Sequence, residues 1–379
     1  MKKVFIICPF TSPNQGGVES HLQKLTSYIA SKGRKTILVS YQPLTTPVKA
    51  PFYEKNSNYE IYRMPWFGNG IFPKIENNAL VTFLYLVPGL LLLSFIVGIY
   101  RRKEIGVIHA HGFAAGFIGL LLGKVLSKRK VISTHAIYNF DNRPILAILV
   151  KNLLLPFEYI LAVGKPSLEE LIKIGIPENK VAVHPNWVDT NFFKPKETKS
   201  SAGKVQAIYV GRGLEKKGIF LFGELAKRNP KIDFLARVGD GPDLAKFINK
   251  YSKVPNLSIR TSLPKDFEEK MKIILKEYQE SDIFIMPSLY PEGFASVVLE
   301  ASASGLAMIS SNTGCLPDMI EGSGAILIEP SLKNFNGALH ELTSNNIVLN
   351  AKKIKMREFA LKNFSQKNAK IIYNSYELI

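Results

Sequence analysis

Residues 4–40 have the sequence VFIICPFTSPNQGGVESHLQKLTSYIASKGRKTILVS. A continuous apolar run opens this stretch, and a polar loop that ends at Gly16 and Gly17 follows it. The next residues carry apolar side chains at helical spacing, Gly33 ends that segment, and a second apolar run occupies residues 36–40. A buried strand, a glycine loop, a helix and another strand in this order predict the opening of a doubly wound parallel sheet.

The same alternation of apolar runs and helical segments continues along the chain. Further strands of the first half are expected at residues 59–63, 105–109, 130–134, 159–163 and 181–184. After a polar, charged stretch the pattern restarts, with a helix at 219–228 and strands at 205–210, 232–238, 257–260, 282–286 and 306–310. The predicted fold class is therefore α/β with two Rossmann-like, doubly wound parallel-sheet domains. The expected parts are a first domain at 1–193, a linker at 194–204, a second domain at 205–363 and a C-terminal helix at 364–379 that returns to the first domain.

The chain of 379 residues has a formal net charge of +18, from 49 Lys and Arg against 31 Asp and Glu. Such an excess attracts polyanions, among them nucleic acid, acidic lipid headgroups and phosphorylated substrates. The sequence has no zinc-ligand spacing and no basic-aromatic signature, so we expect no nucleic-acid partner and favour an anionic membrane surface. The two cysteines, Cys8 and Cys315, are far apart in the sequence, which favours a reducing compartment without a disulfide framework.

Residues 79–100 form a stretch of 22 residues without a charged side chain, and the basic residues 101–103 follow it. A helix of this length would be long enough to cross the apolar core of a bilayer. A single crossing would place the strands expected at 4–8 and 105–109 on opposite sides of the membrane. Since both strands should belong to one sheet, we expect that the helix does not cross.

Two interpretations of this helix remain, a core helix and a helix that lies in the membrane interface. We favour the interface, because the helix lacks a polar face and is followed by basic residues. Contacts with lipid are then expected through residues 90–93, and Pro88 and Gly89 should kink the helix.

Residues 282–301, DIFIMPSLYPEGFASVVLEA, are the most informative segment for chemistry. A buried strand ends in a turn, and a helix is expected to begin near Gly293, where backbone N–H groups and the positive helix end suit a diphosphate. Glu292 stands at the edge of the turn and Glu300 two helical turns further on, so the two carboxylates can hold two groups of one ligand. The structural alternative is that Glu292 caps the helix and Glu300 is a solvated or ion-paired surface residue.

This segment resembles the E-x7-E region of retaining glycosyltransferases of the glycosyltransferase 4 type, also called glycosyl transferases group 1. The resemblance implies the GT-B fold, in which two Rossmann-like domains face a cleft, the first on the acceptor side and the second binding the nucleotide sugar. Similar motifs follow the family's order along the chain, at residues 16–19, 109–112, 183–195, 210–212 with 217–218, 239–242 and 314–321. The chain departs from the family pattern at Ala295, Trp187 and the pair Cys315 and Leu316, which bears on the identity of the donor.

The resemblance implies that Arg212 and Lys217 neutralise the diphosphate, while we interpret the neighbouring Lys216 as a solvated residue. An ordinary solvated turn is the structural alternative for Arg212 and Lys217. The donor-binding residues that it implies are Gly16, Gly17, Arg212, Lys217, Gly239, Glu292, Gly293, Phe294, Ala295, Ser296 and Glu300. Arg212, Lys217, Glu292 and His111 form the implied catalytic set. Neither a metal ion nor another cofactor is expected, because the sequence shows no cluster of divalent-metal ligands.

His111 is expected at the end of a parallel strand, the edge of the sheet at which ligands bind. By resemblance it faces the donor sugar and the acceptor as a hydrogen-bond donor. His135 and Glu19 are weaker candidates for the acceptor. We expect His109 to point to the opposite side of the strand and to be a core residue. Gly16 and Gly17 allow a close approach of the loop backbone to a phosphate or an acceptor, with a plain turn as the alternative.

The predicted function is retaining, metal-independent transfer of a sugar from a nucleotide-diphosphate sugar, with UDP or GDP as the nucleotide. The expected acceptor is a membrane-associated glycan or glycolipid in envelope polysaccharide or lipopolysaccharide biosynthesis. The expected location is the cytoplasm, at the inner face of the cytoplasmic membrane. Two other functions fit the same scaffold. One is a nucleotide-sugar epimerase, for which further acid and base residues are missing from the motifs. The other is a catalytically silent, membrane-docked assembly protein, against which the retained Arg, Lys and Glu residues argue.

Overall fold

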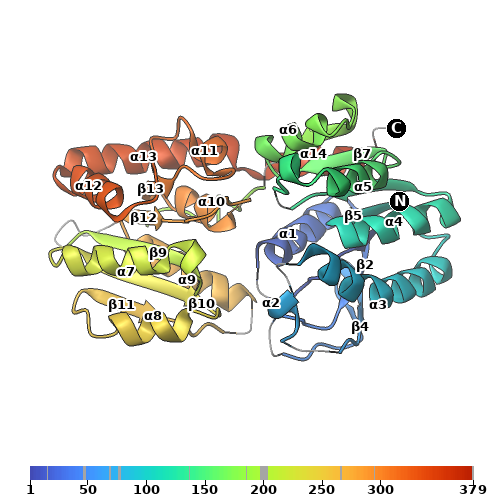
Figure 1. The fold of residues 1–379 in the computed structure, drawn as a ribbon, viewed down its shortest axis with the longest axis horizontal. Coiled ribbons are helices and arrows are strands. Elements are labelled where there is room, and N and C mark those ends of the chain that lie inside the picture. The colour runs from blue at the N-terminus through green and yellow to red at the C-terminus, as the bar shows by residue number, and fades with distance from the viewer. Residues whose placement is uncertain are drawn as a thin grey trace. The chain divides into compact units, whose positions relative to one another are not determined.

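The computed structural model of the chain describes residues 1–379 except Gln15, 46–47, 68–69, 76–77, Ala136, Pro185, 197–203, 265–266, Phe294 and 378–379. Its internal contacts divide the chain into two compact units (Figure 1). Unit 1 comprises Met1–Pro185 together with Ala369–Ile379, and unit 2 comprises Asn186–Asn368.

Unit 1 is built on an eight-stranded sheet in the order β3-β4-β2-β1-β5-β6-β7-β8. Neighbouring strands pair in parallel, except for the antiparallel pair of β3 and β4 at one edge. In β1 the side chains from Val4 to Ile7 are all fully buried, as expected for a parallel strand covered on both faces. The strands are β1 (Lys3–Ile7), β2 (Thr36–Tyr41), β3 (Tyr53–Lys55), β4 (Tyr59–Met64), β5 (Ile105–His111), β6 (Arg129–Ser133), β7 (Tyr159–Ala162) and β8 (Val181–Val183).

The helices of unit 1 lie on the two faces of this sheet according to the direction of each connection. Parallel crossovers are right-handed, so α1, which leads from β1 to β2, lies on the face opposite to α3, α4 and α5, which lead the other way along the sheet. The helices are α1 (Gly17–Ser31), α2 (Phe72–Ile75), α3 (Ala79–Tyr100), α4 (Phe113–Leu126), α5 (Pro144–Leu154), α6 (Lys165–Lys173) and α14 (Ala369–Asn374), with short 3-10 turns η1 (Phe140–Asn142) and η2 (Glu178–Lys180).

Unit 2 has a parallel sheet of six strands in the order β11-β10-β9-β12-β13-β14. The strands are β9 (Gln206–Arg212), β10 (Asp233–Gly239), β11 (Leu257–Arg260), β12 (Ile283–Met286), β13 (Ala307–Ser311) and β14 (Ile326–Ile328). The helices are α7 (Ile219–Arg228), α8 (Leu244–Tyr251), α9 (Phe267–Glu280), α10 (Ser296–Ala303), α11 (Leu316–Ile320), α12 (Leu332–Thr343) and α13 (Asn346–Asn363), with 3-10 turns η3 (Glu215–Lys217) and η4 (Gln366–Asn368).

The predicted fold class is confirmed, since each unit is a Rossmann-like parallel sheet with helical connections. The contacts place the division between the units at residues 185 and 186, earlier than the expected boundary at 193. The reason is local packing: Val188 and Phe193 are buried in the core of unit 2, and the Val188 N–H donates to the carbonyl of Phe364. Most of the expected linker, at 197–203, lies outside the described residues.

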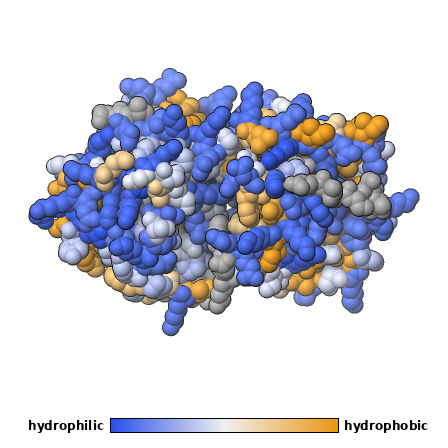
Figure 2. Space-filling model, turned by 180° about the vertical axis from the view of Figure 1, so that it is seen from behind, coloured by the Kyte–Doolittle hydropathy of each residue, from blue (hydrophilic) through white to orange (hydrophobic). Residues whose placement is uncertain are grey.

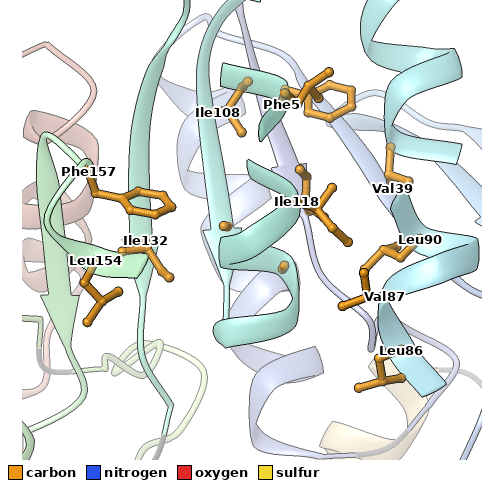
Figure 3. Close-up of a cluster of buried hydrophobic side chains, with 14 of the residues drawn as sticks. Phe5, Val39, Leu86, Val87, Leu90, Ile108, Ile118, Ile132, Leu154 and Phe157 are labelled. Carbon is orange, nitrogen blue, oxygen red and sulfur yellow. The ribbon is translucent and has the colours of Figure 1, made fainter. Parts of the chain in front are cut away.

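Helix α3 has an inner side that belongs to the core of unit 1. Its residues Leu86, Val87 and Leu90 pack with Val39 of β2 and Ile118 of α4 (Figure 3). The strands that precede and follow it in the chain, β4 and β5, are part of one sheet, and β1 pairs directly with β5. The strands expected at 4–8 and 105–109 therefore belong to one sheet, as predicted.

The middle of α3 is joined to β2 by a hydroxyl group. Tyr41 donates to the Leu86 carbonyl and accepts from the Leu90 N–H, each over 2.8 Å. These two backbone groups are four residues apart and would bond to each other in a regular helix. Insertion of a side chain into this ladder, next to Pro88, is an established cause of a helix kink. Gly89 is required here because a Cβ atom would lie 2.5 Å from the Trp66 ring.

Candidate active site

In unit 2, a lysine and a glutamate meet at the carboxyl ends of two neighbouring parallel strands. Lys217 follows β9, Glu292 follows β12, and β9 pairs with β12. The Lys217 Nζ atom lies 2.8 Å from Oε1 and 2.7 Å from Oε2 of Glu292. The Glu292 side chain is 5% exposed, so a buried carboxylate is neutralised by a bidentate contact with one ammonium group.

The side chain of Glu292 is also held by two hydroxyl groups. Ser288, which is fully buried, donates to Oε1, and Tyr290 donates to Oε2 over 3.4 Å. The Tyr290 ring lies between two lysines, with the Nζ atoms of Lys216 and Lys217 each 5.1 Å from its centroid. A cation over an aromatic face is attracted by the ring quadrupole, so Tyr290 positions both members of the ion pair.

The backbone of Glu292 is fixed by the loop that follows β13. The Cys315 N–H donates to the Glu292 carbonyl over 2.8 Å. Gly314 has a φ of +61°, and a Cβ atom there would lie 2.2 Å from the Glu292 carbonyl oxygen. Only glycine permits this approach. The departure from the family pattern at Cys315 and Leu316 places two fully buried side chains directly behind the site.

The charge state of Lys217 is set by two opposing effects. Burial alone would lower its pKa, but the adjacent Glu292 carboxylate outweighs burial and raises the pKa above the ordinary value of 10.5. Lys217 is therefore a cation at neutral pH. Its ammonium group donates to both oxygens of Glu292 and also interacts with the Tyr290 hydroxyl.

Arg212 and Gly239 are the last residues of β9 and β10, and they lie at the same edge of the sheet as Lys217 and Glu292. The Arg212 residue is exposed. The helix expected near Gly293 begins later, as α10 at Ser296, and its N-cap residue Ala295 makes no side-chain hydrogen bond to the first turn. Its first backbone N–H groups have no partner within the helix. Phe294 lies outside the described residues.

The structural alternatives for the two glutamates are both wrong. Glu292 does not cap α10, because its carboxylate contacts Lys217 and Ser288 instead. Glu300 is not a surface residue, since only 5% of it is exposed. It lies beside Tyr278, whose pKa is raised well above 10 by burial and by the Glu300 carboxylate.

In unit 1, five of the six histidines of the chain form a cluster around the carboxyl end of β5. Its members are His21 of α1, His109 and His111 of β5, His135 after β6 and His184 after β8. Burial lowers the pKa of His111 well below 6.5, and neighbouring histidines lower it further. Burial likewise lowers the pKa of His109, His135 and His184, so these four imidazoles are neutral at physiological pH.

His109 and His111 lie on the same side of β5, with their ring centroids 4.2 Å apart. The expectation that His109 points to the opposite side is wrong, because side chains alternate along a strand and residues two apart share a face. His109 is nevertheless a core residue, fully buried between Tyr376, 2.7 Å from its Nδ1, and Ser133, 2.8 Å from its Nε2.

The structure brings the two histidines assigned to the ligand together. His111 Nδ1 and His135 Nε2 are 2.9 Å apart, so one ring donates and the other accepts. The Nε2 atom of His111 is buried and has no partner among the described residues. A buried polar atom without a partner is uncommon in proteins. The hydrogen-bonding role expected of His111 stays a prediction.

The Glu19 carboxylate lies against the glycine loop of unit 1. A Cβ atom on Gly16 would lie 2.5 Å from the Glu19 carboxylate, so Glu19 occupies the space over this glycine. Glu19 itself is 8% exposed. Over Gly17 the space is open, since a Cβ atom there would have no neighbour within 4 Å.

Sequence reasoning missed four residues that shape these sites, namely Ser288, Tyr290, His184 and His21. Ser288 and Tyr290 stand within the quoted segment of residues 282–301, and their polar groups next to Glu292 were a usable signal. His184 directly follows an expected strand, as His135 does. His21 gave no signal, because only the packing of α1 brings it to the cluster. Among the described residues, no group of three or more His, Cys, Asp or Glu has the geometry of a metal site.

Two family models match the chain. The model described as Glycosyltransferase Family 4 matches residues 15–192, and the model described as Glycosyl transferases group 1 matches residues 191–362. Among solved structures, sucrose-phosphate synthase from Thermosynechococcus elongatus has a TM-score of 0.80 at 16% identity, covering 100% of this chain and 99% of that one. Anabaena Alr3699/HepE in complex with UDP-glucose has a TM-score of 0.75 at 14% identity, covering 100% of both chains.

Curated relatives include enzymes of glycolipid and polysaccharide synthesis. The phosphatidylinositol N-acetylglucosaminyltransferase GPI3 subunit of Saccharomyces cerevisiae is 23% identical over 347 residues, which cover 86% of this chain and 71% of the relative. A phosphatidylinositol N-acetylglucosaminyltransferase subunit of Homo sapiens is 25% identical over 345 residues, covering 87% of this chain and 66% of the relative. The putative colanic acid biosynthesis glycosyltransferase WcaL of Escherichia coli is 28% identical over 162 residues, covering 40% of this chain and 38% of the relative.

The fold of two Rossmann-like domains and these similarities define a GT-B glycosyltransferase. The chain belongs to the glycosyltransferases of the family 4 type, and the predicted family, fold and enzyme class are confirmed.

Proposed function

We propose that the chain transfers a sugar from a nucleoside-diphosphate sugar, with UDP or GDP as the nucleotide, to a glycan or glycolipid acceptor that is attached to a membrane. The observation that carries this proposal is the buried Lys217–Glu292 pair at the carboxyl ends of β9 and β12, next to Arg212 and the start of α10. Cations, a carboxylate and unpaired backbone N–H groups are the set of groups that a nucleotide sugar requires.

In the proposed donor complex, Lys217 and Arg212 bind the diphosphate and Glu292 accepts hydrogen bonds from sugar hydroxyls. The first N–H groups of α10 complete the contacts with phosphate oxygens. Glu300, held further along α10, is assigned to the ribose. The solved structure of Alr3699/HepE with UDP-glucose makes UDP-sugars the first donors to test. The names of the yeast and human relatives add UDP-N-acetylglucosamine to that test.

The bond between the anomeric carbon and the diphosphate breaks, and a bond from that carbon to an acceptor oxygen forms. The electron pair leaves with the diphosphate, whose charge Lys217 and Arg212 neutralise, so the proposed reaction needs no metal ion. The acceptor hydroxyl gives its proton to an oxygen of the departing diphosphate, and transfer on that same face of the sugar retains the anomeric configuration. We assign His111 in unit 1 to a hydrogen bond with the sugar or the acceptor, because its buried Nε2 has no partner among the described residues. His135 positions the His111 ring through their mutual hydrogen bond.

The proposed acceptor belongs to envelope glycan synthesis at the inner face of the cytoplasmic membrane. The relatives named for phosphatidylinositol and for colanic acid support a glycolipid or polysaccharide acceptor. The charge of +18 supports association with an anionic surface.

Calorimetric titration with UDP, GDP and their sugars tests donor binding, and NMR of the product tests the anomeric configuration. We expect binding of one nucleotide, unchanged by EDTA, and a product with the configuration of the donor. Binding of neither nucleotide would contradict the proposal, and an epimerised sugar without acceptor would favour the epimerase.

A further inference from the structure

The outer side of α3 is an apolar stripe that no described part of unit 1 covers. Leu80, Leu84, Leu92 and Ile96 follow one another at intervals of four or eight residues, and between 55% and 68% of each side chain is exposed. Pro88, also exposed, completes the spacing. At about 1.5 Å per residue the stripe runs along a helix about 33 Å long. α3 is also the one described helix that is long and apolar enough to cross a membrane by length and composition.

A second exposed apolar ridge lies on α5. Ile145, Ile148 and Leu149 are 74%, 60% and 62% exposed, while Val150 and Leu154 of the same helix point into the core. α4 packs against both α3 and α5, and the three helices lie on one face of the sheet (Figure 1). The outer sides of helices on one face of a sheet point away from it in the same direction, so the two ridges belong to one surface.

Hydrophobic exposure is concentrated on this surface, which we call the α3–α5 face. Of the twenty large hydrophobic side chains exposed among the described residues, eleven lie on α3, α4 or α5. By contrast, the side of the molecule in Figure 2 is mostly hydrophilic, with hydrophobic residues in separate groups. An apolar surface of this extent marks an interaction site rather than ordinary surface.

Positive charge surrounds the α3–α5 face. Residues 72–154 contain ten Lys and Arg but three Asp and Glu. Arg102 and Lys103 beyond the end of α3, Lys124 on α4 and Arg143 before α5 are exposed. Arg101 is different, because its guanidinium pairs with Glu60, 2.8 Å away, and with Glu104. Arg101 is therefore engaged within the protein, whereas Arg102 and Lys103 are exposed.

We infer that the α3–α5 face docks on a bilayer containing anionic lipids, with the ridges of α3 and α5 in the boundary between headgroups and acyl chains. Apolar ridges with basic neighbours match that boundary in both hydrophobicity and charge. The inferred lipid contact thus includes α5 as well as α3. On α3 it is made by the exposed stripe and not by the whole of residues 90–93. Leu90 and Leu93, within the segment first expected to touch lipid, are 0% and 4% exposed and belong to the core. The docking inference rests on the proposed function only in that a membrane-attached acceptor explains why docking is useful.

The test is co-sedimentation with vesicles of phosphatidylcholine, with and without phosphatidylglycerol, at low and high salt. We expect binding to the anionic vesicles that weakens with salt. The pairs Leu84→Glu with Leu92→Glu and Ile148→Glu with Leu149→Glu should each lower affinity at least tenfold, because they put charges into the apolar boundary. Arg102→Gln with Lys103→Gln should lower it by about fivefold per charge removed.

The matched control is Ile347→Glu with Ile354→Glu on α13 of unit 2, where the side chains are 80% and 61% exposed. This control should bind vesicles like the wild type, and circular dichroism should show that all variants fold. The inference would be overturned if the wild-type protein did not bind anionic vesicles at low salt. An equal loss of vesicle affinity in the control variant would also overturn it. Analytical ultracentrifugation adds one further outcome: a dimer that the α3 variants dissociate, without vesicle binding, would make this face an interface between copies.

Calorimetry with UDP, in the absence of vesicles, separates this inference from the proposed function. The α3 and α5 variants should retain nucleotide affinity, since their residues lie in unit 1 and the donor groups in unit 2. Wild-type protein that binds neither UDP nor GDP but still binds vesicles would contradict the proposed function and leave the docking surface standing.

Discussion

The ammonium group of Lys217 donates to both carboxylate oxygens of Glu292, over 2.8 and 2.7 Å, although the two residues are 75 positions apart in the sequence. Each side chain leaves its own strand at the same edge of the sheet, and the pairing of β9 with β12 brings them together. The pair is thus preformed, and its two charges balance. Under the proposed function, a donor phosphate competes with Glu292 for Lys217, and sugar hydroxyls take the place of ammonium hydrogens on Glu292.

Glu292→Gln and Arg212→Ala should each lower turnover by at least about 100-fold, because each removes a group that stabilises charge at the reacting bond. The fold should survive both changes. Glu341→Gln, at an exposed position of α12, is the control and should leave turnover unchanged. The measurement is the initial rate of UDP release, with circular dichroism for folding. Wild-type rates in both site variants would refute the assignment of the donor site.

Gly314→Ala should destabilise unit 2 and displace Glu292, since the new Cβ atom would lie 2.2 Å from the Glu292 carbonyl oxygen. Gly322→Ala is the matched control, because Gly322 has a similar φ of +77° but no atom within 4 Å of the Cβ position. Backbone strain of about 1–2 kcal/mol is common to both, and the steric conflict adds about 1–3 kcal/mol at Gly314 alone. Urea denaturation measures both, and equal losses of stability would show that the close approach is not present.

Tyr41→Phe should lower the free energy of unfolding by about 1–2 kcal/mol, because the Leu86 carbonyl and the Leu90 N–H lose a shared, buried partner. Tryptophan fluorescence reports on the change, since the Trp66 ring lies against Tyr41 with centroids 5.3 Å apart. Tyr53→Phe, at a position that is 43% exposed, serves as the control. A Tyr41 variant as stable as this control would mean that the helix closes its own hydrogen bond there.

Acidification should destabilise unit 1 through the histidine cluster. Burial lowers the pKa of His135 to about 4 and that of His184 to about 3, below the ordinary value of 6.5. Below pH 6.5 the unfolded chain therefore binds protons that the folded chain does not bind, so the free energy of unfolding falls as the pH drops toward 4. The slope is up to about 1.4 kcal/mol per pH unit for each histidine.

The measurement is urea denaturation between pH 7 and pH 5, with His184→Leu as the test variant. Its stability should depend less steeply on pH than that of the wild type. His340→Leu, an exposed position on α12 outside the cluster, should leave the slope unchanged. If the free energy of unfolding depended equally steeply on pH in the wild type and the His184 variant, His184 would not be a cause of the acid destabilisation.

Much of the fold could be predicted because parallel sheets have local signatures. Strands covered on both faces are continuous apolar runs, and glycine and polar turns separate them from helices. The expected strands at 105–109 and 257–260, for example, correspond to β5 and β11. The edge strands β3 and β14 were missed, and neither has a fully buried residue.

The sequence by itself determined the order of elements, the enzyme family and the types of residue at the donor site. Only the tertiary structure decided which side chains meet, such as Lys217 with Glu292, His111 with His135, and Tyr41 with the middle of α3. It also decided that Leu90 is core while Leu92 is surface, although both are leucines in one uncharged helix. The physical reason is that composition and spacing act along the chain, whereas contact and burial depend on neighbours that other elements supply.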